Sequence, residues 1–244
     1  MKTIPFEAQM NVDGQRTCGA AALNMIYKSM GLDLPQTAIW RVISLPDAHG
    51  TRYARTYRMA FDAMLRNVHA VAFRANDPIR AVRETLHSGC DVIMNHRLQN
   101  DTGYGHYTVA LAADDEFIHF HDPQFGPAQK RTGENMRELW RVRHNDCEIT
   151  GDILIALARN ATSHACTTCG SQLPENIPCS QCLGTFSLQP AVGLGCVKNS
   201  CDGKLWQSIL CPYCDVLLAA DSYSTQPNSS LDVGRDSVFL SKRD

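Results

Sequence analysis

The sequence predicts an α+β fold, with helices first and an antiparallel sheet second, followed by a small cysteine-rich module. Apolar residues recur at helical spacing before residue 90, and short segments rich in β-branched and aromatic residues follow. Eight of the eleven cysteines then fall between residues 166 and 214. A chain of 244 residues has room for one mid-sized domain and a small one.

Three helices are expected in the first part of the chain. One begins at Cys18, where a polar loop gives way to small and apolar residues, and ends near Gly31. A second covers residues 56–68. The third follows Asp77, because an aspartate directly before Pro78 supplies both an N-cap and a first-turn proline.

The expected sheet follows these helices. Its strands are predicted over residues 90–97, 106–114, 117–122 and 152–159, with a helix over 135–144 before the last of them. Asp114 and Asp115 supply the turn of a hairpin between the second and third strands. Consecutive strands joined by so short a turn lie antiparallel.

Composition and charge exclude several classes of protein. With 25 acidic and 23 basic residues, the chain lacks the basic excess that carries most nucleic-acid binding. It contains no apolar run near the roughly 20 residues of a membrane span. Its start has no apolar stretch of about 7–15 residues, so no secretory signal is predicted and a cytoplasmic location is expected.

The distribution of cysteine sets the predicted domain boundaries. Residues 1–158 form the first domain, and residues 159–165 are a short polar linker. A zinc-ribbon domain follows over residues 166–220, where large aliphatic residues are too few for a core without metal. The Ser- and Asp-rich residues 221–244 are expected to be a flexible tail.

Four cysteine pairs predict two structural zinc ions. The pairs are Cys166 and Cys169, Cys179 and Cys182, Cys196 and Cys201, and Cys211 and Cys214. A two-residue gap allows one tight turn to present two thiolates to a tetrahedral zinc ion, and four thiolates leave no open position for catalysis. His164 is an alternative ligand. A disulfide-linked module is the alternative for a secreted protein, but no signal peptide supports it.

A second group of residues predicts thiol chemistry. Cys18 lies at a helix N-terminus, where the helix dipole lowers a thiol pKa and favours the nucleophilic thiolate. The two arms of the expected hairpin are nearly equal, which places His106 and Asp122 opposite one another as a base and its orienting partner. Gln9 lies upstream, where its amide can help to bind an oxyanion. His119 and His121 alternate on one strand, and a metal pair there is a weaker alternative to partly buried strand positions.

The segment CTTCGSQLPENIPCSQCLG resembles one half of a double zinc ribbon, and the similarity covers residues 166–214. This resemblance implies sequential pairing, with one ion for the first four cysteines and one for the last four. The second half departs from the pattern, because Cys196 and Cys201 are separated by four residues rather than two. Interleaved pairing therefore stays open.

Gln9, the run that begins at Cys18 (CGAAAL), Gly105-His106-Tyr107 and Asp122-Pro123 resemble the motifs of the bacteriocin-processing, double-glycine leader peptidases. The resemblance covers residues 1–158 and implies a papain-like fold. It also implies Cys18 as nucleophile, His106 as base, Asp122 as its orienting partner and Gln9 as oxyanion donor. Gln9 and Cys18 are nine residues apart, a longer spacing than usual, which implies an inserted loop and leaves Gln15 as an alternative donor.

These observations favour a cytosolic thiol hydrolase that cleaves peptide or isopeptide bonds in a protein or peptide substrate. The zinc ribbons are expected to recruit that substrate or a protein partner. Two alternatives stay open: an acyltransferase that uses the same three residues, and an inactive papain-like domain that acts as an interaction module. Nucleic-acid binding by the ribbons is disfavoured, because they carry few basic residues.

Overall fold

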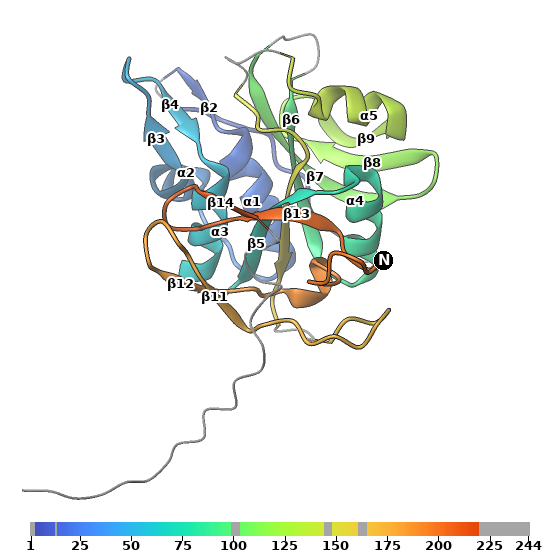
Figure 1. Ribbon diagram of the computed structural model, residues 1–244. Coiled ribbons are helices and arrows are strands. Elements are labelled where there is room, and N and C mark those ends of the chain that lie inside the picture. Colours follow the sequence, from blue (N-terminus) through green and yellow to red (C-terminus); the bar gives the residue numbers. More distant parts are fainter. Residues whose placement is uncertain (1–2, 13, 99–102, 144–147, 161–164, 220–244) are drawn as a thin grey trace, which may run out of the picture.

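A computed structural model describes residues 3–12, 14–98, 103–143, 148–160 and 165–219 (Figure 1). Its centre is an eight-stranded antiparallel sheet with the strand order β14-β13-β5-β10-β6-β7-β8-β9. The strands are β5 (His69–Ala75), β6 (Asp91–Arg97), β7 (Gly105–Ala113), β8 (Phe117–Asp122), β9 (Gly126–Thr132), β10 (Ile153–Ala158), β13 (Trp206–Leu210) and β14 (Leu217–Ala219). The predicted α+β class is confirmed.

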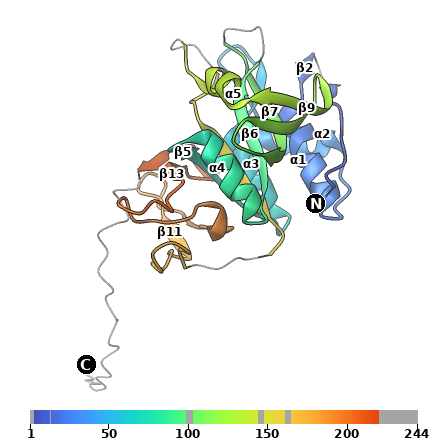
Figure 2. The ribbon, with the colours of Figure 1, turned by 90° about the vertical axis from the view of Figure 1, so that its right-hand side faces the viewer.

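Helices cover both faces of this sheet (Figures 1 and 2). One face buries α1 (Cys18–Ser29), α2 (Gln36–Ile43) and α3 (Thr56–Leu65). The other face buries α4 (Pro78–His87), α5 (Gly133–Trp140) and the cysteine-rich segment. Because side chains alternate along a strand, neighbours such as Val92 and Ile93 lie in different cores.

Three small hairpins and one turn of 3-10 helix, η1 (Ala191–Gly193), complete the fold. The hairpins pair β1 (Asn11–Val12) with β2 (Gln15–Arg16), β3 (Ser44–Pro46) with β4 (Arg52–Ala54), and β11 (Asn176–Pro178) with β12 (Thr185–Ser187). The first of them forms the inserted loop that the long spacing between Gln9 and Cys18 predicts.

The sequence predicts where α1 and α4 begin, but α3 ends at Leu65 rather than at residue 68, and α5 covers Gly133–Trp140 rather than 135–144. α1 begins at Cys18, and Gly31 after it has a φ of +79°, which favours glycine. Residues 18–27 are all buried, as expected of a central helix that is apolar on every side. Asp77 caps α4 by accepting hydrogen bonds from the N–H groups of Ile79 and Arg80. α2, β5 and β9 were not predicted from the sequence.

The cysteine-rich segment is built onto the sheet. β13 pairs with β5, and Ile209 lies opposite Phe73 in the same core. Trp206 is also buried there, and its indole N–H donates to the carbonyl of Cys196 over 2.9 Å. The predicted division into residues 1–158 and 166–220 stays a prediction, but the described residues of both parts share one sheet and one core. No helix among these described residues is long and apolar enough to cross a membrane.

Candidate functional site

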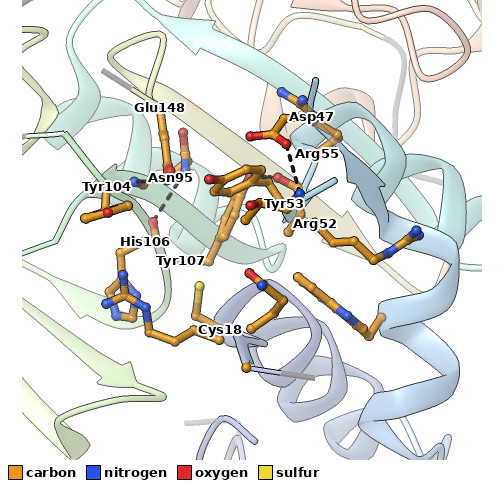
Figure 3. A pocket seen from close by; sticks show the side chains of 17 residues that line it. Cys18, Asp47, Arg52, Tyr53, Arg55, Asn95, Tyr104, His106, Tyr107 and Glu148 are labelled. Carbon is orange, nitrogen blue, oxygen red and sulfur yellow. Dashed lines mark hydrogen bonds between the residues drawn. The ribbon is translucent and has the colours of Figure 1, made fainter. Parts of the chain in front are cut away.

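A cleft of about 610 Å³ opens beside the N-terminus of α1 (Figure 3). Its walls come from both N-terminal hairpins, from the start of β7 and from Glu148. Cys18 and His106 line it, together with Gly14, Gln15, Arg16, Trp40, Asp47, Thr51, Arg52, Tyr53, Ala54, Arg55, Asn95, Tyr104, Gly105 and Tyr107. A cleft of this volume accommodates several residues of an extended peptide or a small ligand.

Cys18 is the first residue of α1 and is 8% exposed. The side chain of His106 and the backbone N–H groups of Tyr107 and Gly19 lie close enough to its sulfur to lower the pKa of the thiol. The next residue has to be small: a Cβ on Gly19 would lie 2.9 Å from the Cβ of Ala54. This close approach brings the N-terminal end of α1 against the wall of the cleft.

His106 and Asp122 meet on neighbouring strands. The His106 ring donates through Nε2 to Oδ1 of Asp122 over 2.8 Å, and both side chains are buried. Asp122 Oδ1 also accepts from the N–H groups of Gln124 and Phe125. Since Nε2 faces the carboxylate, Nδ1 is the nitrogen left for the sulfur of Cys18.

The two residues were expected directly opposite one another, and their register differs from that expectation. β7 pairs Val109 with His121, and a bulge interrupts the ladder between Ala110 and Ala112. Extending the register of Val109 with His121 places Asp122 opposite Thr108, so His106 contacts it diagonally, two residues away from a direct pair. Both side chains remain on one face of the sheet, so the contact forms all the same.

Electrostatics favour a thiolate beside an imidazolium. Burial acts to raise the pKa of the Cys18 thiol, but the hydrogen bond and the charge of His106 outweigh it and lower that pKa. Burial acts to lower the pKa of His106, and the hydrogen bonds with Asp122 and Cys18 outweigh it and raise this pKa to about 9. The pKa of Asp122 is held below its usual value by His106, in spite of burial.

The hairpin β1–β2 brings Gln9 back toward Cys18. Met10 and Thr17 are hydrogen-bonded across its base, which continues the register of Asn11 with Arg16. The next pair in this register would be Gln9 with Cys18. The amide of Gln9 lies 3.4 Å from Gln124, however, and its buried Oε1 has no hydrogen-bond partner. Gln9 does not line the cleft, whereas the alternative donor Gln15 does.

A buried amide that was not predicted from the sequence holds this segment in place. Gln36 of α2 is 3% exposed. Its Oε1 accepts from the N–H of Met10 and from the hydroxyl of Thr17, and its Nε2 donates to Glu7 and to the carbonyl of Ala8. One side chain thus ties the stretch around Gln9 to the residue before Cys18. Its polar neighbours are distant in the sequence, so no local signal identifies it.

A second buried histidine touches the base. His96 lies opposite His106 on β6, and their rings meet edge to face at 5.6 Å. His96 contacts the carbonyl of Arg97 through Nδ1 and the hydroxyl of Thr108 through Nε2. Burial first, and then the charge of His106, lower the pKa of His96 to about 3. His96 is therefore neutral and leaves the positive charge on His106.

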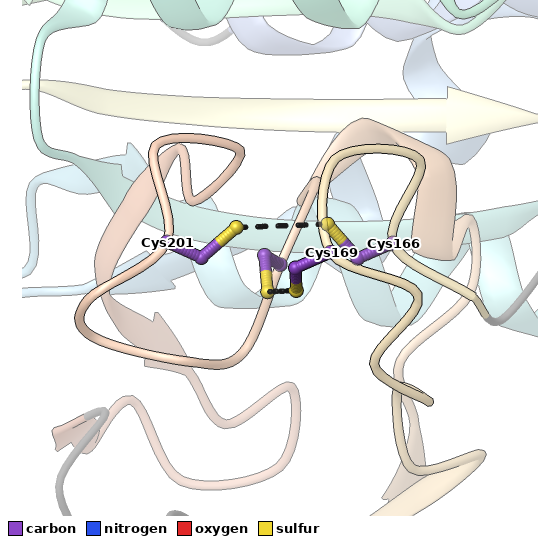
Figure 4. Close-up of side chains that lie close together, drawn as sticks. Cys166, Cys169 and Cys201 are labelled. Carbon is purple, nitrogen blue, oxygen red and sulfur yellow. Dashed lines mark hydrogen bonds between the residues drawn. The ribbon is translucent and has the colours of Figure 1, made fainter.

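Eight cysteines form two groups, and in each group the four sulfur atoms lie within 4.8 Å of one another. The first group contains Cys166, Cys169, Cys196 and Cys201 (Figure 4), and the second contains Cys179, Cys182, Cys211 and Cys214. Within each group, the sulfur atoms of one cysteine pair lie 3.6–3.8 Å from those of the other pair. Four thiolates at about 2.3 Å from a tetrahedral zinc ion would be separated by about 3.8 Å.

This grouping corrects the sequential pairing that the double-ribbon resemblance implied. Each group joins the first pair of one half to the first pair of the other, or the second to the second, so the pairing is interleaved. The donor set fits zinc, and backbone N–H groups of Lys198, Gly203 and Tyr213 donate to ligand sulfurs. Sequence spacing could not reveal this, because all four pairs have similar form.

The remaining candidates have ordinary roles or lie elsewhere. His121 uses both ring nitrogens, one with the carbonyl of Ile4 and one with the N–H of Ala128, which leaves none for a metal shared with His119. Cys90 is a buried core residue. His164, Cys147 and the expected tail over 221–244 lie outside the described residues.

Several solved structures resemble this chain, among them two peptidase domains of transporters. A double glycine motif protease from an AMS/PCAT transporter, solved in complex with the leader peptide, has 17% sequence identity and a TM-score of 0.42, and the match covers 64% of this chain and 91% of that one. The peptidase domain of Streptococcus ComA, a bifunctional ABC transporter of a quorum-sensing pathway, has 16% identity and a TM-score of 0.47, over 63% and 98%. No protein-family model matches the chain, and no curated protein matches it. Likeness at this level carries no argument about activity, so the proposals below rest on the geometry of this chain.

Proposed function

We propose that this protein is a cysteine peptidase that cleaves peptide or isopeptide bonds in a protein or peptide substrate, with Cys18 as nucleophile. The observation that carries this proposal is the placement of Cys18 and His106 in one cleft of about 610 Å³, with His106 hydrogen-bonded to Asp122 and close enough to the sulfur to lower the pKa of the thiol. A nucleophile, a base and an orienting acceptor in contact are what covalent acyl transfer requires.

In the proposed reaction, the Cys18 thiolate attacks the substrate carbonyl carbon, and the π electrons move onto the oxygen. The intermediate collapses to a thioester as the amine leaves with a proton from Nδ1 of His106. Water then attacks the thioester while the same nitrogen takes a proton from it. Release of the carboxylic acid restores the thiolate and the imidazolium, and Asp122 holds the ring in one orientation throughout.

The oxyanion would lie at the N-terminus of α1. Thr17 makes no side-chain cap to this helix, because its hydroxyl bonds Met10 and Gln36 instead. The backbone N–H of Cys18 is one donor in this proposal, and Gln9 is the second. For Gln9 the support is the register of the hairpin, whose continuation by one residue beyond Met10 and Thr17 would pair it with Cys18.

The two cysteine groups would each hold one structural zinc ion, and the ions would fix the fold of residues 166–214. We include in this proposal that the ribbons hold the substrate or a protein partner. What supports this role is the exposed apolar surface next to the second group, where Leu183 is 83% exposed and Tyr213 is 42% exposed. The expected cytoplasmic location stays a prediction.

The deciding experiment is alkylation of Cys18 by iodoacetamide across pH, followed by mass spectrometry of the Cys18 peptide. The proposal expects fast reaction well below pH 8, and about a tenfold or greater loss for His106→Ala. Gln9→Ala should leave alkylation of Cys18 fast but should slow its acylation by a peptide thioester about 100-fold. Gln15→Ala, which removes the alternative oxyanion donor, is the matched variant. An ordinary thiol at Cys18 would sink the peptidase proposal and favour an interaction module.

A further inference from the structure

The walls of the cleft beside Cys18 come from two hairpins that the proposed mechanism does not use. The inserted hairpin β1–β2 contributes Gly14, Gln15 and Arg16, and the hairpin β3–β4 with the residues around it contributes Asp47, Thr51, Arg52, Tyr53, Ala54 and Arg55. The insertion therefore builds one wall of the cleft and places a cation on it.

The cleft is lined by more basic than acidic side chains, and these side chains differ in the hydrogen bonds that they already make. Three arginines face two carboxylates. Both carboxylates accept from backbone N–H groups: Asp47 from His49 and Thr51, and Glu148 from Gly105. These bonds hold their own loops in place, and they partly neutralise the carboxylates.

The arginines differ from one another. Arg52 is held against the wall of the cleft, because its guanidinium donates to the hydroxyl and the carbonyl of Ser44. Arg16 lies over the ring of Tyr104 at 5.1 Å, which orients its guanidinium without satisfying its N–H donors. Arg55 has no side-chain hydrogen bond or ion pair with any residue that the structure describes. Burial raises the pKa of the nearby Asp215 carboxyl, and the charge of Arg55 offsets only part of that rise.

We propose that the cleft binds a carboxylate of the substrate near the scissile bond, with Arg16 and Arg55 as its ligands. Guanidinium groups match carboxylates in shape and charge, and two of them that line one cleft bind an anion better than either would on an open surface. The carboxylate is an acidic side chain or a free chain terminus. This inference rests on the proposed peptidase function, since it defines the substrate of the same site.

The test uses chloroacetyl peptides, which alkylate Cys18 and extend along the cleft. The alkylation rates of chloroacetyl-Gly-Glu-amide and chloroacetyl-Gly-Gln-amide are compared to detect binding of a side-chain carboxylate. The rates of chloroacetyl-Gly-Gly as the free acid and as the amide are compared to detect binding of a terminal carboxylate. Rates are measured on the full chain by mass spectrometry at about pH 8.5, where an ordinary thiol also reacts. The ratios are thus readable even if Cys18 is no activated nucleophile, and the two proposals can fail separately.

The expected result is that at least one acid reacts about fivefold faster than its neutral partner. Arg16→Gln with Arg55→Gln should bring that ratio close to one, and Arg55→Lys should keep most of it. Arg41→Gln, which removes an exposed arginine of α2 outside the cleft, should leave the ratio unchanged. Equal rates for both pairs in the unmodified protein, or an acid preference that survives the double substitution, would overturn the proposal.

Discussion

His106 donates through Nε2 to Oδ1 of Asp122 over 2.8 Å, and this bond is one reason why the pKa of His106 reaches about 9. Asp122→Asn keeps an oxygen acceptor for the ring and for the N–H groups of Gln124 and Phe125, and removes only the charge. The substitution should therefore lower the pKa of His106 toward its usual value of 6.5 while preserving the local structure.

This shift has a definite sign in the pH profile. Protonated His106 is needed to release the amine, so kcat/KM should fall as pH rises through the pKa of His106. The upper limb should lie near pH 9 in the unmodified protein and move to lower pH in Asp122→Asn, with at least about a tenfold loss at neutral pH. Alkylation of Cys18 across the same range is the companion measurement. An upper limb that stays in place would show that Asp122 does not set the pKa of His106.

Local patterns predicted the elements that carry the site, but long-range contacts decided how they meet. The start of α1 at Cys18 follows from an abrupt change from polar to small and apolar residues. The bulge between Ala110 and Ala112 has no sequence signal, so the predicted contact of His106 with Asp122 was right in kind and wrong in register. The arginines of the cleft come from two small hairpins and the residue after the second, and strands of two or three residues are too short to show a periodic pattern.

The same limit applies to the cysteine-rich segment. Four similar cysteine pairs predict that thiolates will bind metal, but sequential and interleaved pairing would each supply every ion with two pairs. The interleaved scheme is set by where the chain between the pairs can pack, and β13 packs against β5 at the edge of a sheet formed by residues far away in the sequence. Such edge pairing leaves no trace in the local sequence pattern.

Gly19 is predicted to be required by the close approach of α1 to the cleft wall. A Cβ there would lie 2.9 Å from the Cβ of Ala54, so Gly19→Ala should lower the free energy of unfolding by about 1–3 kcal/mol, although alanine favours helix. Urea unfolding measures this loss. The double variant with Ala54→Gly should recover much of it, because the clashing atom is gone.

The matched control is Gly133→Ala at the start of α5, where the nearest atom would be 3.7 Å away and no loss is expected. Strict additivity of Gly19→Ala and Ala54→Gly would contradict a direct clash between the two side chains.

Gln36 is predicted to be a positioning residue. Gln36→Leu removes the hydrogen bonds that tie Ala8 and Met10 to Thr17, and should lower the free energy of unfolding by about 2–4 kcal/mol. If the segment also places Gln9, acylation should slow while the pKa of Cys18, measured by alkylation, stays low. Gln207→Leu on the exposed side of β13 is the control and should change stability by less than about 0.5 kcal/mol. A stability loss without any change in acylation would leave Gln36 a structural residue only.

Removal of metal is predicted to destabilise the whole molecule, because β13 joins the cysteine groups to the sheet. The strand runs between Cys201 of the first group and Cys211 of the second, and its Ile209 lies opposite the fully buried Phe73 of β5. Without metal, the cysteines of each group would take up protons and nothing would hold their four sulfurs together, so β13 would lose its two anchors and Phe73 would be uncovered. EDTA with a reductant should therefore lower the temperature of a single unfolding transition, whereas zinc-saturated EDTA should not.

Elemental analysis should find about two zinc ions per chain. Two separate transitions, with the one of residues 1–158 unchanged by EDTA, would instead support two independent domains.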